Sequence, residues 1–420
     1  MSRPHKRVLI YSHDTFGLGH LRRCQAIAHA LVAHRQDLSV LILSGSPIIG
    51  SFDFRARVDF VRVPGVIKLR NGEYTPLNLH IDIEETLALR ASIVRHTAEI
   101  FDPDLFIVDK EPLGLRGEVG STLTMLKARG IPLVLGLRDV MDEPAALAPE
   151  WERKNVLPAL RDLYDAIWVY GLPEVCDPLT GIDLPSSVRD KMQYTGYLRR
   201  TVPSGPQPTP AAAARDRKPY ILVTTGGGGD GDGLIDWVLS AYEQFPDLPL
   251  RALLVFGPFL QADLQAEFLK RVARLRNVEA ITFDSHLEAL MARAEGVISM
   301  GGYNTVCEIL SFDKRAIIVP RTVPRMEQLI RATRFQEMGL VTMLADDGKR
   351  DPKVMAEALR RLPEQQLPSS VAPEGLLDGL EGVQRRADGQ LAQPIAARLR
   401  IARQRARSLA FRVARPNHTG

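Results

Sequence analysis

Short apolar runs alternate with amphipathic stretches through the first 200 residues. The apolar runs predict strands at 7–11, 38–43, 60–63, 105–108, 132–137 and 166–169. Apolar residues at helical spacing predict helices near 82–100, 116–129 and 151–163. Strands that are apolar throughout and alternate with helices are typical of a parallel sheet covered on both faces. We therefore expect a first domain of the Rossmann-like α/β class.

A second alternation of the same kind begins beyond residue 218. Prolines, glycines and alanines fill 202–218, which is the composition of a linker. Further apolar runs predict strands at 220–225, 252–256, 278–283, 296–300 and 316–319. The pattern therefore predicts four parts in the order Rossmann-like domain, linker, Rossmann-like domain and helical basic tail, at 1–200, 201–218, 219–362 and 363–420.

Composition narrows the class of protein. The 420 residues, 45% of them hydrophobic, suffice for two globular domains with substantial cores. A formal net charge of +4 is small for this length, so no nucleic-acid partner is expected. The three widely spaced cysteines favour neither a disulfide framework nor a zinc site, and they suit a reducing cytoplasm. No run of about twenty apolar residues and no signal-peptide pattern occurs, so no membrane span is expected.

The segment 299–328 carries the clearest candidate site. A predicted strand meets two glycines at 301–302, where a helix begins, and the free N–H groups of a helix start attract an anion. Glu308 lies about one turn into this helix, where its carboxylate can accept bonds from two adjacent hydroxyls of a ribose. Glu327 and Gln328 come to the same rim and can hold the hydroxyls of a hexose. Together these residues indicate a nucleotide-sugar site.

This constellation resembles the donor half of the MurG-like glycosyltransferases of family 28, whose GT-B fold consists of two Rossmann-like, doubly wound domains facing across a cleft. The resemblance covers residues 220–345 well and implies a nucleoside diphosphate sugar, UDP-linked, as the donor. Arg331 departs from the family's pattern, which often has asparagine there. The resemblance implies that the diphosphate, ribose and sugar contact Gly302, Tyr303, Asn304, Thr305, Glu308, Glu327 and Gln328.

A second motif directly follows the first predicted strand. Gly17 and Gly19 allow a tight turn, and His20 lies on the first turn of the helix that follows. A helix N-terminus disfavours the imidazolium ion, so the ring stays neutral near pH 7 and can accept a proton. A lone histidine of this kind more often only bonds a loop carbonyl. In the resembling family the matching histidine lies beside the reacting centre, so we predict that His20 is the catalytic base.

A glycine-rich turn containing Gly227 and Gly228 lies between the first strand and first helix of the second domain, where open parallel sheets bind ligands. Its amides can stabilise a diphosphate leaving group, so no metal and no other cofactor is strictly required. Asp230 and Asp232 either cap the next helix or hold a divalent cation. Phe283 ends a strand and either contacts the base or belongs to the core.

Acceptor contacts are expected from loops of the first domain. Asp109 and Glu111 follow one predicted strand and Asp139 follows another, so all three should overlook the cleft. Each is either a partner of His20, a base in its place, or a helix cap or solvated charge. The long polar loop at 64–82 is a further candidate, because long loops on such scaffolds tend to bind ligands.

The last 26 residues, 395–420, form the basic part of the tail and have an amphipathic pattern. Apolar residues between 395 and 413 recur at helical spacing, and seven arginines lie between 398 and 415 with no acidic residue among them. Such a helix either binds an anionic membrane surface or packs its apolar stripe on the protein. RNA and an acidic protein are further alternatives, although few aromatics are present for base stacking.

The sequence thus predicts a cytoplasmic, hexosyltransferase-type enzyme, at the inner membrane face if the tail binds lipid. It would move a sugar, with inversion, from a nucleoside diphosphate sugar to an unknown hydroxyl acceptor, a lipid-linked one being a candidate. Three alternatives stay open. One is a nucleotide-sugar hydrolase, because the pattern from Gly17 to Cys24 also resembles enzymes that cleave nucleotide-linked diacetamido sugars. The others are a non-hydrolysing epimerase and an inert nucleotide-sugar-binding subunit.

Overall fold

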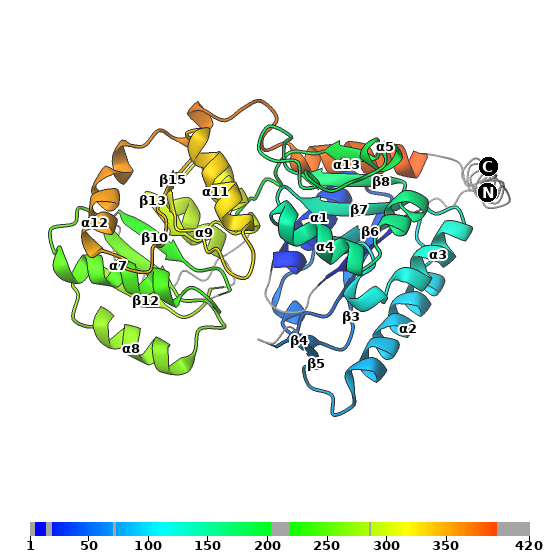
Figure 1. Cartoon of the computed structure of the whole chain (residues 1–420), viewed down its shortest axis with the longest axis horizontal. Coiled ribbons are helices and arrows are strands. Elements are labelled where there is room, and N and C mark those ends of the chain that lie inside the picture. The colour runs from blue at the N-terminus through cyan, green and yellow to red at the C-terminus, as the bar shows by residue number, and fades with distance from the viewer. Residues whose placement is uncertain are drawn as a thin grey trace, which may run out of the picture.

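The structure is a computed structural model, and it describes residues 5–13, 19–69, 73–202, 219–227, 229–284 and 287–392. Two α/β lobes lie side by side, each built on its own parallel sheet (Figure 1). The predicted fold class is therefore confirmed. Gly17, Gly228 and the amphipathic tail segment 395–413 lie outside the described residues.

The first lobe is built on seven parallel strands in the order β3-β2-β1-β6-β7-β8-β9. Apolar residues fill these strands because helices cover both faces of the sheet. The strands are β1 (Lys6–Ser12), β2 (Leu38–Ser44), β3 (Val58–Arg62), β6 (Leu105–Asp109), β7 (Leu133–Arg138), β8 (Ala166–Tyr170) and β9 (Met192–Tyr194). The helices between them are α1 (Gly19–His34), α2 (Ile83–Phe101), α3 (Gly120–Ala128), α4 (Pro144–Arg153) and α5 (Ser186–Arg189).

Two details of the first lobe differ from the prediction. The helix predicted at 151–163 is wrong, because α4 ends at Arg153 and a separate short π-helical turn spans Ala159–Leu163. Asn155 between them has a φ of 49°, which ends a right-handed helix. The long loop at 64–82 contains a small antiparallel hairpin of β4 (Val66–Lys68) and β5 (Tyr74–Pro76).

The second lobe is built on six parallel strands in the order β12-β11-β10-β13-β14-β15. The sheet order reverses beside β10, so the carboxyl ends of β10 and β13 flank a switch point where open sheets bind ligands. The strands are β10 (Tyr220–Thr224), β11 (Arg251–Val255), β12 (Val278–Ile281), β13 (Gly296–Ser299), β14 (Arg315–Ile318) and β15 (Thr342–Met343). The helices are α7 (Asp232–Gln244), α8 (Ala262–Val272), α9 (Leu287–Arg293), α10 (Tyr303–Ser311), α11 (Glu327–Glu337) and α12 (Pro352–Arg361).

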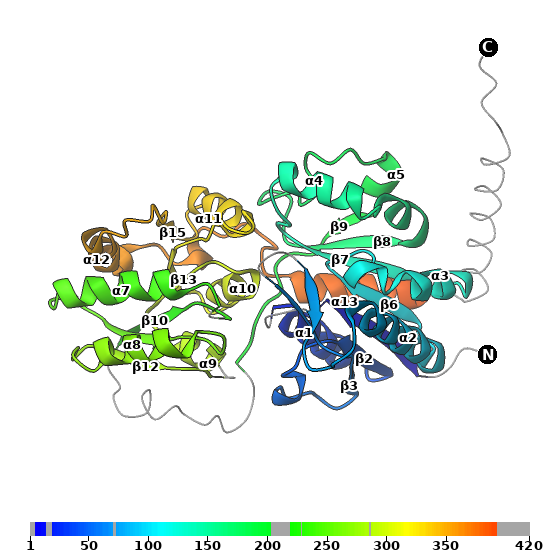
Figure 2. The ribbon, with the colours of Figure 1, turned by 60° about the horizontal axis from the view of Figure 1, so that its bottom comes forward.

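The chain returns to the first lobe near its end. Helix α13 (Gly379–Ala392) lies beside α1 (Figure 2), and Gln384 donates to the carbonyl of Ala30 at 2.9 Å. The returning segment is bonded to the outgoing one, since Tyr197 N–H donates to the Leu376 carbonyl at 2.7 Å and Gly379 N–H donates to the Tyr197 carbonyl at 3.1 Å. We call this pair of segments, joined where Tyr197 bonds Leu376 and Gly379, the double crossing. The domain ranges read from the sequence stay a prediction.

Within the described residues, no helix has the length and apolar character that crossing a membrane requires.

Candidate functional site

A cavity of about 440 Å³ lies between the lobes and receives side chains from both. Most residues predicted for the site line it. From the first lobe these are Gly19 and His20, and from the second they are Gly227, Phe283, Gly302, Tyr303, Asn304, Thr305, Glu327 and Gln328. The structure therefore brings together residues that lie as much as 309 positions apart in the chain, from Gly19 to Gln328.

His20 lies on the first turn of α1, and the Asp109 carboxylate at the end of β6 holds its ring. Its Nδ1 lies 2.5 Å from Oδ2 of Asp109, and the side chain is 19% exposed. Arg23 binds the same carboxylate in bidentate fashion, with Nε to Oδ1 at 2.8 Å and Nη2 to Oδ2 at 2.7 Å. Burial lowers the pKa of His20 below its usual 6.5, although the Asp109 carboxylate acts in the opposite direction. A neutral ring that donates through Nδ1 leaves Nε2 able to accept a proton.

The helix α10 begins at the cavity wall. Gly302 is its N-cap and has no side chain to cover the free N–H groups of the first turn. Gly301 has a φ of 77°, and a Cβ there would lie 2.7 Å from the side chain of Ile318, so the turn requires glycine. Tyr303, Asn304 and Thr305 all line the cavity. This helix start offers backbone donors suited to a diphosphate.

Glu308 lies one turn further along α10 and has no exposed surface. It does not line the cavity, because Arg22 of α1 comes between and its Nη2 lies 2.7 Å from Oε1 of Glu308. The same guanidinium forms an ion pair with Glu288 of α9. Burial raises the pKa of Glu308 to about 7, although Arg22 acts to lower it. The carboxylate that the sequence predicted for a ribose is therefore paired with Arg22, which itself lines the cavity.

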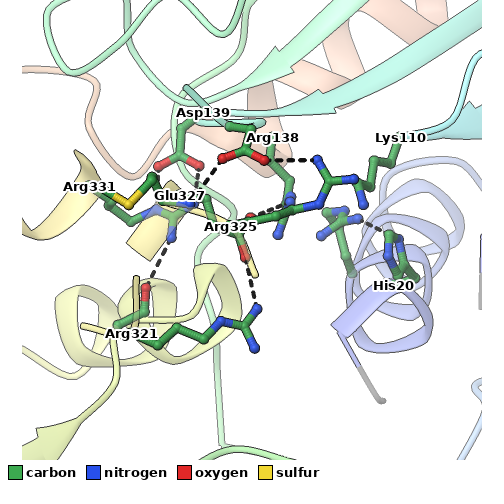
Figure 3. Close-up of polar contacts among 12 residues, drawn as sticks. His20, Lys110, Arg138, Asp139, Arg321, Arg325, Glu327 and Arg331 are labelled. Carbon is green, nitrogen blue, oxygen red and sulfur yellow. Dashed lines mark hydrogen bonds and ion pairs between the residues drawn. The ribbon is translucent and has the colours of Figure 1, made fainter. Parts of the chain in front are cut away.

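Glu327 and Gln328 begin α11 at the opposite rim. Glu327 forms an ion pair with Arg138, which reaches across from the end of β7 (Figure 3). Burial alone would raise the pKa of Glu327, but Arg138 and Arg331 lower it to about 2, so the group is a carboxylate at neutral pH. Gln328 Oε1 accepts from the backbone N–H of Arg321 at 3.1 Å, so the amide nitrogen is the end of this side chain that can donate to a hydroxyl.

The glycine-rich turn approaches the next strand end closely. Gly257 has a φ of 86°, and a Cβ there would lie 2.7 Å from the Gly226 carbonyl. Gly227 accepts from the N–H of Phe259 at 3.0 Å and faces the cavity. Asp230 forms an ion pair with Arg321 and does not cap α7, whose N-cap is Gly231. Phe283 lines the cavity and is 41% exposed.

The three acidic acceptor-side candidates have different partners. Asp109 contacts His20, as described above. Glu111 is bound by Lys154, with 2.8 Å between Oε2 and Nζ. Asp139 is fully buried and faces the second lobe, where it binds Arg331. Of the three, only Asp109 lies within hydrogen-bond distance of His20.

Asp139 and Arg331 form a bidentate ion pair between the lobes, with Nε to Oδ2 at 2.6 Å and Nη2 to Oδ1 at 2.7 Å (Figure 3). Neither side chain has exposed surface. The Tyr197 hydroxyl donates to the same carboxylate at 2.7 Å, and Arg331 Nη1 donates to the Gly301 carbonyl at 3.0 Å. Arg331 thus ties the first lobe to the glycine turn before α10.

Four cavity arginines were not predicted as site residues. Arg22 and Arg23 lie two and three positions after His20, and Arg138 directly precedes Asp139, so their positions near candidates were the available signal. Arg321 follows β14 at its carboxyl end. These cations suit a diphosphate. Among the residues that the structure describes, no group of three or more histidine, cysteine or acidic side chains is placed to hold a metal ion.

Residues 221–373 match the family model described as the glycosyltransferase family 28 C-terminal domain. This range contains the donor motif at 299–328. The resemblance predicted from the sequence is therefore confirmed for the second lobe.

Two curated proteins show similarity at different extents. A Streptococcus pyogenes protein, "UDP-N-acetylglucosamine--N-acetylmuramyl-(pentapeptide) pyrophosphoryl-undecaprenol N-acetylglucosamine transferase", is 29% identical over 130 residues. The aligned segment covers 26% of this chain and 36% of that relative, so the similarity spans about a third of the relative's length. A Methanosarcina mazei protein named "Uncharacterized glycosyltransferase" is 24% identical over 366 residues, which is 83% of this chain and 88% of the relative.

The crystal structure of Acinetobacter baumannii MurG has a TM-score of 0.57 to this chain at 14% identity. The match covers 92% of this chain and all of the MurG chain. At this identity the likeness shows the fold alone, and the chain has the GT-B fold.

Proposed function

We propose that this chain is a glycosyltransferase that moves a sugar from a nucleoside diphosphate sugar, UDP-linked, to a hydroxyl acceptor with inversion. The observation that carries the proposal is the position of His20. Its ring, bonded to Asp109, lines the same cavity as the start of α10. A base and an anion cradle that face one cavity are what an attack on an anomeric carbon beside a diphosphate requires.

In the proposed reaction, the acceptor oxygen forms a bond to the anomeric carbon while the bond from that carbon to the diphosphate oxygen breaks. His20 Nε2 takes the acceptor proton, and Asp109 stabilises the resulting imidazolium through Nδ1–H. One base on one face of the sugar suits a single, inverting displacement.

The leaving diphosphate gains negative charge in this step. The N–H groups of Tyr303, Asn304 and Thr305 stabilise it, together with the amide of Gly227. Arg138 and Arg321 line the same cavity and add positive charge. Glu327 and Gln328 bind the sugar hydroxyls, and Glu308 binds the ribose once Arg22 has moved away.

The test is to incubate the purified chain with a panel of nucleotide sugars, with and without lipid-linked and soluble acceptors. Glycosylated product that forms only with an acceptor supports transfer. Nucleotide released at the same rate without an acceptor contradicts it and supports hydrolysis, and binding without turnover supports an inert subunit.

A histidine control assigns the chemistry. His20→Ala should abolish most turnover, whereas His96→Ala, at an exposed position of α2, should leave it unchanged. Equal activity of both variants would mean that His20 is not the base.

A further inference from the structure

Arg200 lies outside the cavity and carries no role in the reaction described above. It follows the double crossing in the first lobe, and its side chain reaches into the junction between α1 and α10. Its backbone N–H donates to Oγ of Ser311 at 2.8 Å, at the carboxyl end of α10. Its guanidinium makes two further bonds, and each goes to a different helix.

The first of these bonds goes to the donor helix. Arg200 Nη2 donates to Oδ1 of Asn304 at 2.7 Å. The amide nitrogen of Asn304 in turn donates to the Gly19 carbonyl at 2.9 Å, the residue before His20. Because one amide oxygen and one amide nitrogen are both used, the orientation of the Asn304 side chain is fixed.

The second bond goes to the helix that carries the base. Arg200 Nη1 donates to the carbonyl of Arg22 at 3.2 Å. The turn of α1 from Gly19 to Arg22 is therefore tied to α10 at both of its ends, and His20 lies between the two ties. Asp109 holds only the ring of His20 and not the backbone of this turn.

We infer that Arg200 is a positioning residue, which fixes the His20-bearing turn of α1 on the donor helix α10. This inference rests on the proposed function, since it concerns the distance between the base and the anomeric carbon. Arginine is required because a planar guanidinium can donate to two acceptors in different directions at once. A lysine at this position could satisfy only one of the two acceptors well.

The contacts predict a separation of binding from chemistry. Arg200→Ala removes the hydrogen bonds to the side chain of Asn304 and to the carbonyl of Arg22, but the backbone N–H groups of α10 remain. The variant should bind UDP within about twofold of the wild type and lose about a hundredfold in turnover, since a misplacement of about 1 Å has this effect on rate. The turnover of Arg200→Lys should lie between that of the wild type and that of Arg200→Ala.

Arg334 supplies a matched control. It is also an arginine that bonds backbone carbonyls across the lobes, donating to Glu174 at 2.9 Å and Val175 at 3.1 Å. Arg334→Ala therefore removes a tie of the same kind away from His20. Both variants should lose similar stability in thermal unfolding, but only Arg200→Ala should lose turnover selectively.

A second readout needs no acceptor. Diethyl pyrocarbonate acylates neutral histidine, and peptide mass spectrometry gives the rate at His20 with and without UDP. The rate should rise several-fold in Arg200→Ala and stay at the wild-type value in Arg334→Ala. Equal acylation rates in the two variants would overturn the inference, as would a loss of UDP affinity that matches the loss of turnover. If the wild type turns over no nucleotide sugar, the proposed function fails, whereas the acylation rates still decide the role of Arg200.

Discussion

The ion pair between Asp139 and Arg331 predicts a large loss of stability when either charge is removed. Both side chains are fully buried, and two bonds of 2.6 and 2.7 Å join them. Asp139→Asn leaves the guanidinium of Arg331 buried without its hydrogen-bonded carboxylate, and Glu327 then acts on it only through space. Arg331→Met leaves the Asp139 carboxylate with the Tyr197 hydroxyl, at 2.7 Å, as its remaining donor among the bonds described above.

The magnitude follows from the burial of the pair. Removing one partner of a buried ion pair costs about 3 to 5 kcal/mol, because the other charge stays in a medium of low polarity. Replacing both partners by apolar residues avoids that cost and is often close to neutral. The double variant Asp139→Leu/Arg331→Met should therefore be much more stable than the sum of the two single changes predicts.

The assay is urea unfolding at pH 7, followed by circular dichroism and by tryptophan fluorescence. Trp168 lies in the first sheet and Trp237 in α7, so both lobes contribute to the fluorescence signal. Arg360→Met is the control, because Arg360 pairs with Asp247 at 3.1 Å with side chains 40% and 70% exposed. An exposed pair of this kind contributes less than about 1 kcal/mol.

Two results would refute this reasoning. Single variants that lose no more stability than Arg360→Met would mean that water reaches the pair in solution. A double variant whose loss equals the sum of the single losses would mean that the two charges do not interact. Either result would mean that the charge pairing of Asp139 with Arg331 does not stabilise the contact between the lobes.

Three further predictions concern the pH dependence of the site and the tail. The pKa of His20 is lowered below 6.5 by burial, so turnover at saturating donor should be constant above pH 7 and fall only as pH drops below 6.5, which a pH profile of kcat measures. The pKa of Glu308 is raised to about 7 and the ribose needs the ionised carboxylate, so UDP affinity should strengthen as pH rises through 7. Titration calorimetry measures this affinity, and Glu308→Gln should remove its pH dependence. Removal of residues 395–420 should abolish sedimentation with anionic vesicles at low salt while UDP binding is kept; equal sedimentation of both proteins would leave the tail without a membrane role.

The sheets could be predicted because their strands are continuous apolar runs in a fold that buries both faces. The run at 105–108, for example, became the fully buried strand β6. The helix predicted at 151–163 failed because periodicity does not report the left-handed backbone at Asn155. The hairpin of β4 and β5 escaped prediction because its strands are only three residues long.

The site was predicted where a local pattern states the chemistry, and it was missed where partners are distant in sequence. His20 and the start of α10 are marked by glycine turns and both line the cavity. The partners of Glu308 and Asp139 could not be predicted, because Arg22 and Arg331 lie 286 and 192 positions away from them. Only the packing of the two lobes brings such charges together.

The double crossing has a consequence for how the chain behaves when it is cut. The chain leaves the first lobe beyond Arg200 and returns between Ser370 and Leu376, after which α13 packs on α1. A protease that nicks the chain within 203–218 therefore does not release two separate lobes. The C-terminal fragment still carries α13, which remains packed on α1 of the N-terminal fragment. The nicked protein should therefore migrate as one particle under native conditions and as two fragments only after denaturation.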